Sequence, residues 1–187
     1  QIIHDKLRDD GVQIHTQKTV KNILSRYDTI QAVQLTDGTE ISCDLLILAI
    51  GVRPNIGFLE GSGIQTDRGV IVDDAMRTSH ADIFAAGDVA QGHDILTGVK
   101  RPVAIFPSAF GQGKTAGLNM AGGSAEYKGS MAMNSVGFRG IHMISVGYIQ
   151  PPDDSCEVLS RLDRKRGVYK KVILKENRII GAMFVND

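Results

Sequence analysis

Residues 78–88 read TSHADIFAAGD, and this segment decides the fold of the chain. Its apolar residues Ile83–Ala86 predict a short buried strand that runs directly into a glycine and a carboxylate. Since Gly87 has no Cβ, a ligand can approach the backbone there, and the carboxylate of Asp88 offers two acceptor oxygens. Open α/β sheets bind ligands at the carboxyl ends of their strands. The segment therefore indicates a ligand site, although taken alone it also fits a tight turn capped by the aspartate.

A second segment, the apolar run Leu45–Ile50, stands 37 residues before the first when counted from Gly51 to Asp88. The run has no polar face, which predicts a strand covered on both sides, as in a central parallel sheet. The small residues Ala49 and Gly51 at its end would let the chain cross closely over a cofactor. The Arg53-Pro54 pair that follows favours an extended backbone, so we expect a sharp change of direction there.

Composition and charge exclude several classes of protein. The 187 residues are 42% hydrophobic and 22% charged, as in an ordinary globular protein. Twenty-one Lys and Arg balance 21 Asp and Glu, so no net field attracts nucleic acid or an anionic membrane. No apolar run approaches the roughly 20 residues of a membrane span and no leader opens the chain, so we expect a cytoplasmic protein. The two cysteines and five histidines show no ligand spacing, which predicts no metal site.

The apolar pattern in the first part of the chain predicts a helix followed by short strands. The helix begins at Ile2 and stops at Gly11, since glycine readily takes the left-handed conformation that ends helices. The strands are expected to form a small antiparallel meander that leads into the apolar run. Their predicted ranges are Val12–His15, Val20–Leu24, Ile30–Leu35 and a short strand at Ile41.

The pattern after Gly51 predicts two further parts joined by a glycine-rich linker at residues 121–124. The first part has a short helix near Phe58, a strand at Val70–Val72, a polar surface excursion over Gln91–Lys100 and a long helix. The second part is rich in β-structure, and its last two strands form a hairpin. Its predicted strands are Ile141–Val146, Val168–Leu174 and Ile179–Val185.

The long helix is expected to start at Pro107 and to reach about Met120. Its first turn, near Phe106, Pro107 and Ser108, carries unpaired N–H groups and partial positive charge, which favour an anion. Glycine lowers helix stability by about 1 kcal/mol relative to alanine, so the glycines of this helix predict close packing. These glycines are Gly111, Gly113 and Gly117.

The same helix contains Gly111-Gln112-Gly113-Lys114-Thr115, which invites comparison with a nucleotide-binding P-loop. That motif requires a glycine five positions before Gly113, where this chain has Ser108. We therefore interpret Lys114 as a solvated helix residue. A local basic group nearer the end of the chain is interpreted as a solvated sheet edge, because no aromatic pattern accompanies it and an acidic residue interrupts it. This group comprises Arg161, Arg164, Lys165, Arg166, Lys170 and Lys171.

Taken together, the two segments resemble the flavin-binding regions of the pyridine nucleotide-disulfide oxidoreductase family. The resemblance implies that Asp88 holds a ribityl hydroxyl of FAD. It also implies that the helix opening at Pro107 faces the pyrimidine side of the isoalloxazine and stabilises the reduced flavin. The cofactors implied are FAD and NAD(P)H, and no catalytic residue is assigned. The implied cofactor-binding residues are Ala49, Gly51, Arg53, Gly87, Asp88, Phe106, Pro107 and Ser108.

The resemblance also implies a fold: an α/β chain holding part of a two-dinucleotide-domain FAD/NAD(P)-binding fold, followed by a truncated α+β interface domain. Residues 1–50 are expected to be the tail of the NAD(P)H-binding domain and residues 51–122 the carboxyl-terminal half of the FAD-binding domain. Residues 123–187 are expected to start the interface domain. The branch most resembled contains rubredoxin reductases, NADH oxidases and nitrite reductase large subunits. The family's two GxGxxG motifs are absent from these 187 residues, so we expect them upstream.

The function implied is that of a fragment of an oxidoreductase that passes hydride from NAD(P)H to flavin and on to an unidentified acceptor. We expect a homodimer formed through the carboxyl-terminal domain, with a redox protein as a further partner. We expect the fragment alone to be inactive, and we expect no binding to nucleic acid or membrane. The alternative is a non-catalytic binding or dimerisation module with a vestigial flavin site.

Overall fold

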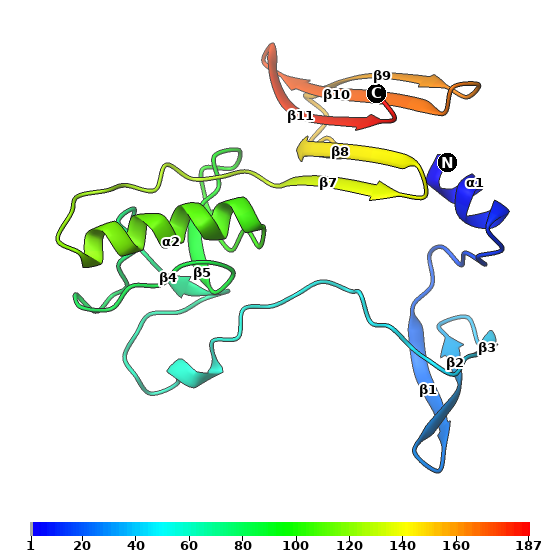
Figure 1. Cartoon of the computed structure of the whole chain (residues 1–187), viewed down its shortest axis with the longest axis horizontal. Helices are drawn as coiled ribbons and strands as arrows, with labels where there is room; N and C mark the ends of the chain where they lie inside the picture. Colours follow the sequence, from blue (N-terminus) through cyan, green and yellow to red (C-terminus); the bar gives the residue numbers. More distant parts are fainter. Residues whose placement is uncertain (1) are drawn as a thin grey trace. The chain divides into compact units, whose positions relative to one another are not determined.

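The computed structural model describes residues 2–187, and these form two compact units, Gln1–Gly51 and Val52–Asp187. Both units contain helices as well as strands, which confirms the predicted α/β class (Figure 1). The division into three domains, at residues 50 and 122, stays a prediction. None of the helices in the described residues is both long and apolar enough to cross a membrane.

The first unit opens with α1, Ile2–Asp9, and the chain turns at Gly11 with a φ of +82°. The predicted meander is confirmed: three antiparallel strands lie in the order β1-β2-β3. The tight turn between the first two strands has positive φ at both central residues, Tyr27 and Asp28, which matches the twist of a hairpin. The strands are β1, Val20–Arg26; β2, Thr29–Leu35; and β3, Glu40–Ser42.

Two strand predictions in this unit are wrong. Val12–His15 and Leu45–Ile50 are not strands, and the side chains of the second segment are exposed rather than covered: Leu45 is 74% exposed and Ile50 is 89% exposed. An extended segment becomes a strand only when a neighbouring strand pairs with its backbone groups. No strand within residues 2–187 lies beside either segment. The apolar pattern therefore indicated residues that favour burial, but it did not indicate whether a neighbouring strand is present.

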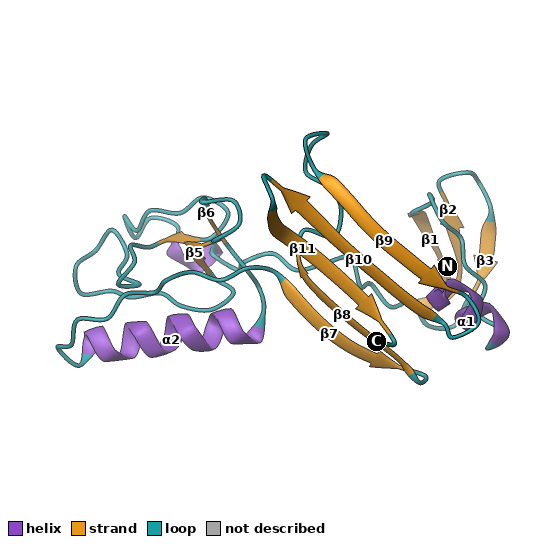
Figure 2. Cartoon of the chain, turned by 90° about the horizontal axis from the view of Figure 1, so that it is seen from above, coloured by secondary structure: helices purple, strands orange, loops and turns teal. Residues whose placement is uncertain are grey.

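The second unit begins with the 3₁₀ helix η1, Gly57–Leu59, and a small sheet of order β4-β5-β6. Strands β4, Val70–Ile71, and β5, Ala90–His93, are parallel, and β6, Lys100–Arg101, pairs antiparallel to β5. The helix α2, Phe106–Met120, packs beside this sheet, as Figures 1 and 2 both show. The predicted helix is thus confirmed and starts one residue earlier than expected. The buried core between them comprises Val70, Val72, Met76, Ala90, Ala116 and Tyr127.

The predicted surface excursion over Gln91–Lys100 is wrong for its first residues, which form β5, whereas residues 95–99 are irregular and mostly exposed. Gln91 is only 6% exposed and Asp94 is fully buried. Both polar side chains point inward to satisfy backbone groups: the Gln91 Oε1 accepts from Gly69 N at 2.9 Å, and the Asp94 Oδ1 accepts from Leu96 N at 2.9 Å. The polar composition of the segment predicted exposure to solvent, whereas these two side chains are buried and form hydrogen bonds inside the protein.

The last part of the chain is a five-stranded antiparallel sheet of order β7-β8-β11-β10-β9 (Figure 2). The three predicted strands and the terminal hairpin are confirmed as β8, β10 and β11. The two edge strands were not predicted, because every residue of β7 is exposed and β9 is exposed in all but its last residue. The strands are β7, Met133–Phe138; β8, Ile141–Gly147; β9, Glu157–Asp163; β10, Val168–Lys175; and β11, Arg178–Val185.

Candidate functional site

The Gly-Asp segment, which comprises residues 78–88, lies between a short loop and α2. Phe84 makes an isolated antiparallel bridge with Arg77, so the predicted strand is reduced to a single bridge. Gly87 has a φ of +84°, a conformation that favours glycine. The carboxylate of Asp88 is exposed, and no hydrogen bond or ion pair joins it to the side chains or backbone of residues 2–187. Its acceptor oxygens therefore remain available to a ligand.

The carboxylate lines a hollow of about 400 Å³, here called the Asp88 pocket, together with Arg53. Arg53 and Asp88 lie 35 positions apart in the sequence, so the fold brings these two residues to one pocket. The rest of the lining is largely apolar and includes Asn55, Phe58, Pro102 and Ala104, which sequence reasoning missed. The full lining is Val52, Arg53, Pro54, Asn55, Phe58, Asp88, Val89, Pro102 and Ala104.

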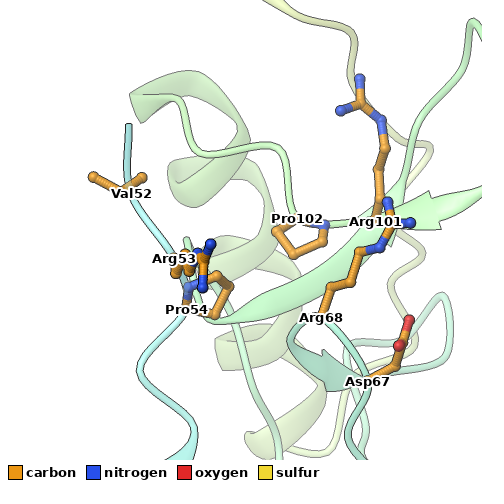
Figure 3. Close-up of a pocket in the computed structure, with 7 residues that line it drawn as sticks. All are labelled: Val52, Arg53, Pro54, Asp67, Arg68, Arg101 and Pro102. Carbon is orange, nitrogen blue, oxygen red and sulfur yellow. The ribbon is translucent and has the colours of Figure 1, made fainter. Parts of the chain in front are cut away.

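A second hollow, of about 470 Å³, shares Val52, Arg53, Pro54 and Pro102 with the Asp88 pocket. We call it the arginine hollow, because its other lining residues add two arginines to Arg53. Figure 3 shows its side chains, which come from the segment after Gly51, from the turn before β4 and from the end of β6. The added residues are Asp67, Arg68 and Arg101.

One wall of the arginine hollow is fixed by a buried carboxylate. The Oδ2 of Asp94 lies 2.6 Å from Arg101 Nε and 2.5 Å from the terminal nitrogen Nη2 of the same guanidinium. Burial acts to raise the pKa of Asp94, but the backbone N–H of Leu96 and the Arg101 guanidinium outweigh it, so the pKa lies below its usual value. Asp94 therefore stays ionised and orients the arginine.

Part of the amino terminus of α2 is accessible to a ligand. No side chain caps it, Ile105 stands at the N-cap position, and Phe106 is 82% exposed. Pro107 occupies the first turn, as predicted, where its missing N–H costs no hydrogen bond. Ser108 differs, because its side chain is only 1% exposed and its hydroxyl bonds to other side chains of the protein. Because the whole residue is buried, the Ser108 hydroxyl is not offered to a ligand at this helix end.

A buried glutamine, Gln112, links α2 to the Gly-Asp segment. Its Oε1 accepts from Gly87 N at 2.7 Å, and its Nε2 donates to Ser108 Oγ at 3.3 Å. The same hydroxyl lies 2.9 Å from the phenol oxygen of Tyr127 and accepts from Ser130 Oγ at 3.1 Å. Sequence reasoning missed Gln112. The available signal was a polar residue on the face of the helix that also carries Ser108, four positions earlier.

Two predicted site residues belong to the first unit. Ala49 is exposed, and Gly51 has a φ of +96°, a conformation that favours glycine. The Asp88 pocket is lined only by residues of the second unit. The roles of Ala49 and Gly51 therefore stay predictions, whereas Arg53 and Asp88 share a pocket. Within residues 2–187, no three His, Cys, Asp or Glu side chains gather closely enough to hold a metal ion.

Known proteins match both ends of this chain. The pyridine nucleotide-disulphide oxidoreductase family matches residues 1–113, and the rubredoxin NAD⁺ reductase C-terminal domain matches residues 133–187. The chain is 37% identical to the epsilon subunit of NADH-dependent phenylglyoxylate dehydrogenase of Aromatoleum evansii, covering 100% of the chain and 44% of that protein. It is 32% identical to the NADH-rubredoxin oxidoreductase of Clostridium acetobutylicum, covering 99% of the chain and 43% of that protein.

A solved structure extends the similarity to the fold. The FAD-dependent pyridine nucleotide-disulphide oxidoreductase from Desulfovibrio vulgaris matches with a TM-score of 0.88 at 25% identity, covering 100% of this chain and 48% of that one. The chain thus spans about half the length of the relatives it matches. The cofactors predicted were FAD and NAD(P)H; FAD is named for the Desulfovibrio vulgaris protein, and NADH is named for the two curated relatives. Because the family match extends over residues 1–113, the chain belongs to the pyridine nucleotide-disulphide oxidoreductase family, as the Gly-Asp segment predicted.

Proposed function

We propose that this chain forms the ribityl and ring side of the flavin site in an FAD-dependent NAD(P)H oxidoreductase. Such an enzyme passes hydride from NAD(P)H to flavin and then reduces an acceptor. One observation carries the proposal: Arg53 and Asp88, from distant segments, line one pocket in which the carboxylate has no partner among the described residues. The alternative is the binding or dimerisation module with a vestigial flavin site.

The residues present fit the flavin in three respects. Asp88 can accept a hydrogen bond from a ribityl hydroxyl, because its oxygens are exposed at the pocket. Gly87 lets a ligand approach the backbone, and Gln112 fixes that backbone through its 2.7 Å bond to Gly87 N. The uncapped start of α2 can face negative charge on a reduced flavin.

The cofactor supplies the hydride chemistry, and the protein supplies position and electrostatics. Bound FAD would accept hydride from NAD(P)H at its ring. The role of this chain is to hold the ribityl chain at Asp88 and to keep the ring near the start of α2, where Phe106 is exposed. No residue of the chain is assigned a proton-transfer step.

The acceptor and the assembly belong to the same proposal. A relative named NADH-rubredoxin oxidoreductase supports a small redox protein as the acceptor. Oxygen, a disulfide and a partner subunit remain alternatives. We further propose a homodimer formed through the five-stranded sheet. We also propose a cytoplasmic location, since the balanced charges of the chain give no net attraction to an anionic membrane.

The test is the flavin content of the purified full-length protein after Asp88→Ala substitution. We expect the native protein to show visible flavin absorbance and the variant to lose most of it, because the ribityl hydroxyl loses its acceptor. Asp82→Ala is the matched control, since Asp82 is also exposed in this segment but does not line the pocket. Unchanged flavin content in Asp88→Ala would favour the vestigial module, and a native protein without flavin would refute the proposed function.

A further inference from the structure

We infer that the arginine hollow binds a phosphate group. Three arginine residues line it, and they come from three separate segments of the second unit: Arg53, Arg68 and Arg101 (Figure 3). A guanidinium presents several N–H donors in one plane, a geometry that matches the oxygens of a phosphate. A tetrahedral anion carrying up to two charges can meet donors from several directions, which a planar carboxylate does less well.

The hollow has fixed walls. On one side, the bonds from Arg101 to the buried Asp94 hold its guanidinium through Nε and Nη2. On the other side, the turn that carries Arg68 is pressed against β5. The backbone N–H of Gly69 donates to Gln91 Oε1 at 2.9 Å, and a Cβ on Gly69 would collide with the carbonyl oxygen of Val89.

The charges of the hollow favour an anion. Arg101 is neutralised by Asp94, but no carboxylate among the described residues lies within ion-pair distance of Arg53 or Arg68. Asp67 also lines the hollow, and Figure 3 shows its carboxylate on the opposite side from Arg53. Like charges gathered in a concave site create a positive potential that a phosphate reduces.

The phosphate can come from two sources. The arginine hollow shares Val52, Arg53, Pro54 and Pro102 with the Asp88 pocket, so a dinucleotide held there could place its own phosphates against the arginines. A separate soluble phosphate compound could fill the hollow instead. The inference concerns the shared chemistry and rests on the arginines, not on the proposed flavin function.

The experiment titrates the purified full-length protein with inorganic phosphate at low ionic strength, and calorimetry measures the binding. We expect Arg68→Gln to weaken phosphate binding roughly tenfold or more, because it removes a charge-assisted hydrogen bond. Arg68 suits the test, since it is exposed and has no ion-pair partner whose loss would disturb the fold. Arg164→Gln is the matched control, because it removes the same charge from an exposed turn outside the hollow.

Repeating the titration with saturating FAD separates the two sources. If FAD displaces phosphate and Arg68→Gln also weakens FAD, the hollow holds the phosphates of the cofactor. If phosphate binds equally with FAD present, the hollow serves a separate anion. Undetectable phosphate binding by the full-length protein after its flavin has been removed, or equal affinity in Arg68→Gln and Arg164→Gln, overturns the inference. A protein that binds phosphate but no flavin would refute the proposed function and leave this inference standing.

Discussion

At the scale of single residues, buried polar side chains hold the site together. Gln112 fixes Gly87 by one hydrogen bond and meets Ser108 by another. Gln112 is only 1% exposed, and among the described residues no buried side-chain polar atom is left without a partner. Hydrogen bonds of this kind favour one arrangement, because breaking any of them leaves a buried group unsatisfied. The position of Asp88 therefore depends on a residue outside the pocket.

Asp94 makes the stability of the second unit depend on pH. Its pKa is lower in the folded protein than the usual 3.8, so its ionised form stabilises the fold above that value. This contribution is lost as the pH falls through the lowered pKa. We expect Asp94→Asn to lower the free energy of unfolding by about 2 kcal/mol near neutral pH, because Arg101 loses a buried charged partner.

Urea unfolding followed by circular dichroism checks this expectation at neutral pH and at an acid pH below the lowered pKa of Asp94. The difference between Asp94→Asn and the native protein should shrink in acid, where the native carboxyl is also protonated. Asp82→Asn serves as the control, since Asp82 is exposed and should change little at either pH. A loss of the same size at every pH would show that the charge of Asp94 is not the cause.

Sequence patterns could point to proposed site residues whose type has few alternative uses. A glycine at a strand end, an aspartate after it and an arginine before a proline point to Gly87, Asp88 and Arg53. Gln112 and Asp94 could not be found in this way, because polar residues are usually exposed and nothing local shows that these two are buried. Their roles depend on which backbone groups the fold leaves unpaired.

At the scale of elements, α2 is a helix whose glycines differ in their surroundings. A Cβ on Gly111 would lie 3.2 Å from Cε2 of Tyr127, whereas a Cβ on Gly113 or Gly117 would meet nothing within 4 Å in the structure described. The close packing predicted for all three glycines is therefore found at Gly111 alone. Tyr127 cannot easily move aside, because it is 8% exposed and its hydroxyl lies 2.9 Å from Ser108 Oγ.

This difference predicts that replacing glycine by alanine has opposite effects on the stability of residues 1–187, depending on which glycine of α2 is replaced. We expect Gly113→Ala and Gly117→Ala each to stabilise α2 by about 1 kcal/mol, because alanine favours helix more than glycine does. Gly111→Ala should lose that gain or destabilise the protein, since its Cβ presses on a held ring. Thermal unfolding midpoints of the three variants test the prediction. A lower midpoint for Gly113→Ala would mean that another surface packs on that side of the helix.

Predictions of elements succeeded where the signal was local. Pro107 near the start of α2 and the apolar stretches of β8, β10 and β11 are visible in a short window of sequence. The edge strand β7 has no buried residue, so no alternation marks it. Leu45–Ile50 failed for the opposite reason: its apolar pattern is strong, but strand formation requires a partner that the described residues do not supply.

At the scale of the whole molecule, the residues of this chain form only one side of the proposed flavin site. The second unit offers Asp88, the start of α2 and the adjoining arginines, but the 187 residues contain no GxGxxG motif to bind a pyrophosphate at a helix start. The chain also spans only 44% and 43% of two curated relatives. We therefore expect its residues alone to provide part of the binding free energy for FAD.

The consequence can be measured by comparing residues 1–187 with the full-length protein. We expect the isolated chain to bind FAD roughly 100-fold more weakly or worse, because losing two charge-assisted hydrogen bonds to phosphate has about that effect. It should also fail to oxidise NADH. Equilibrium dialysis gives the affinity, and loss of NADH absorbance gives the activity. Robust NADH oxidation by the isolated chain would contradict the expectation. Tight FAD binding that Arg68→Gln abolishes would mean that the arginine hollow replaces the missing phosphate motif.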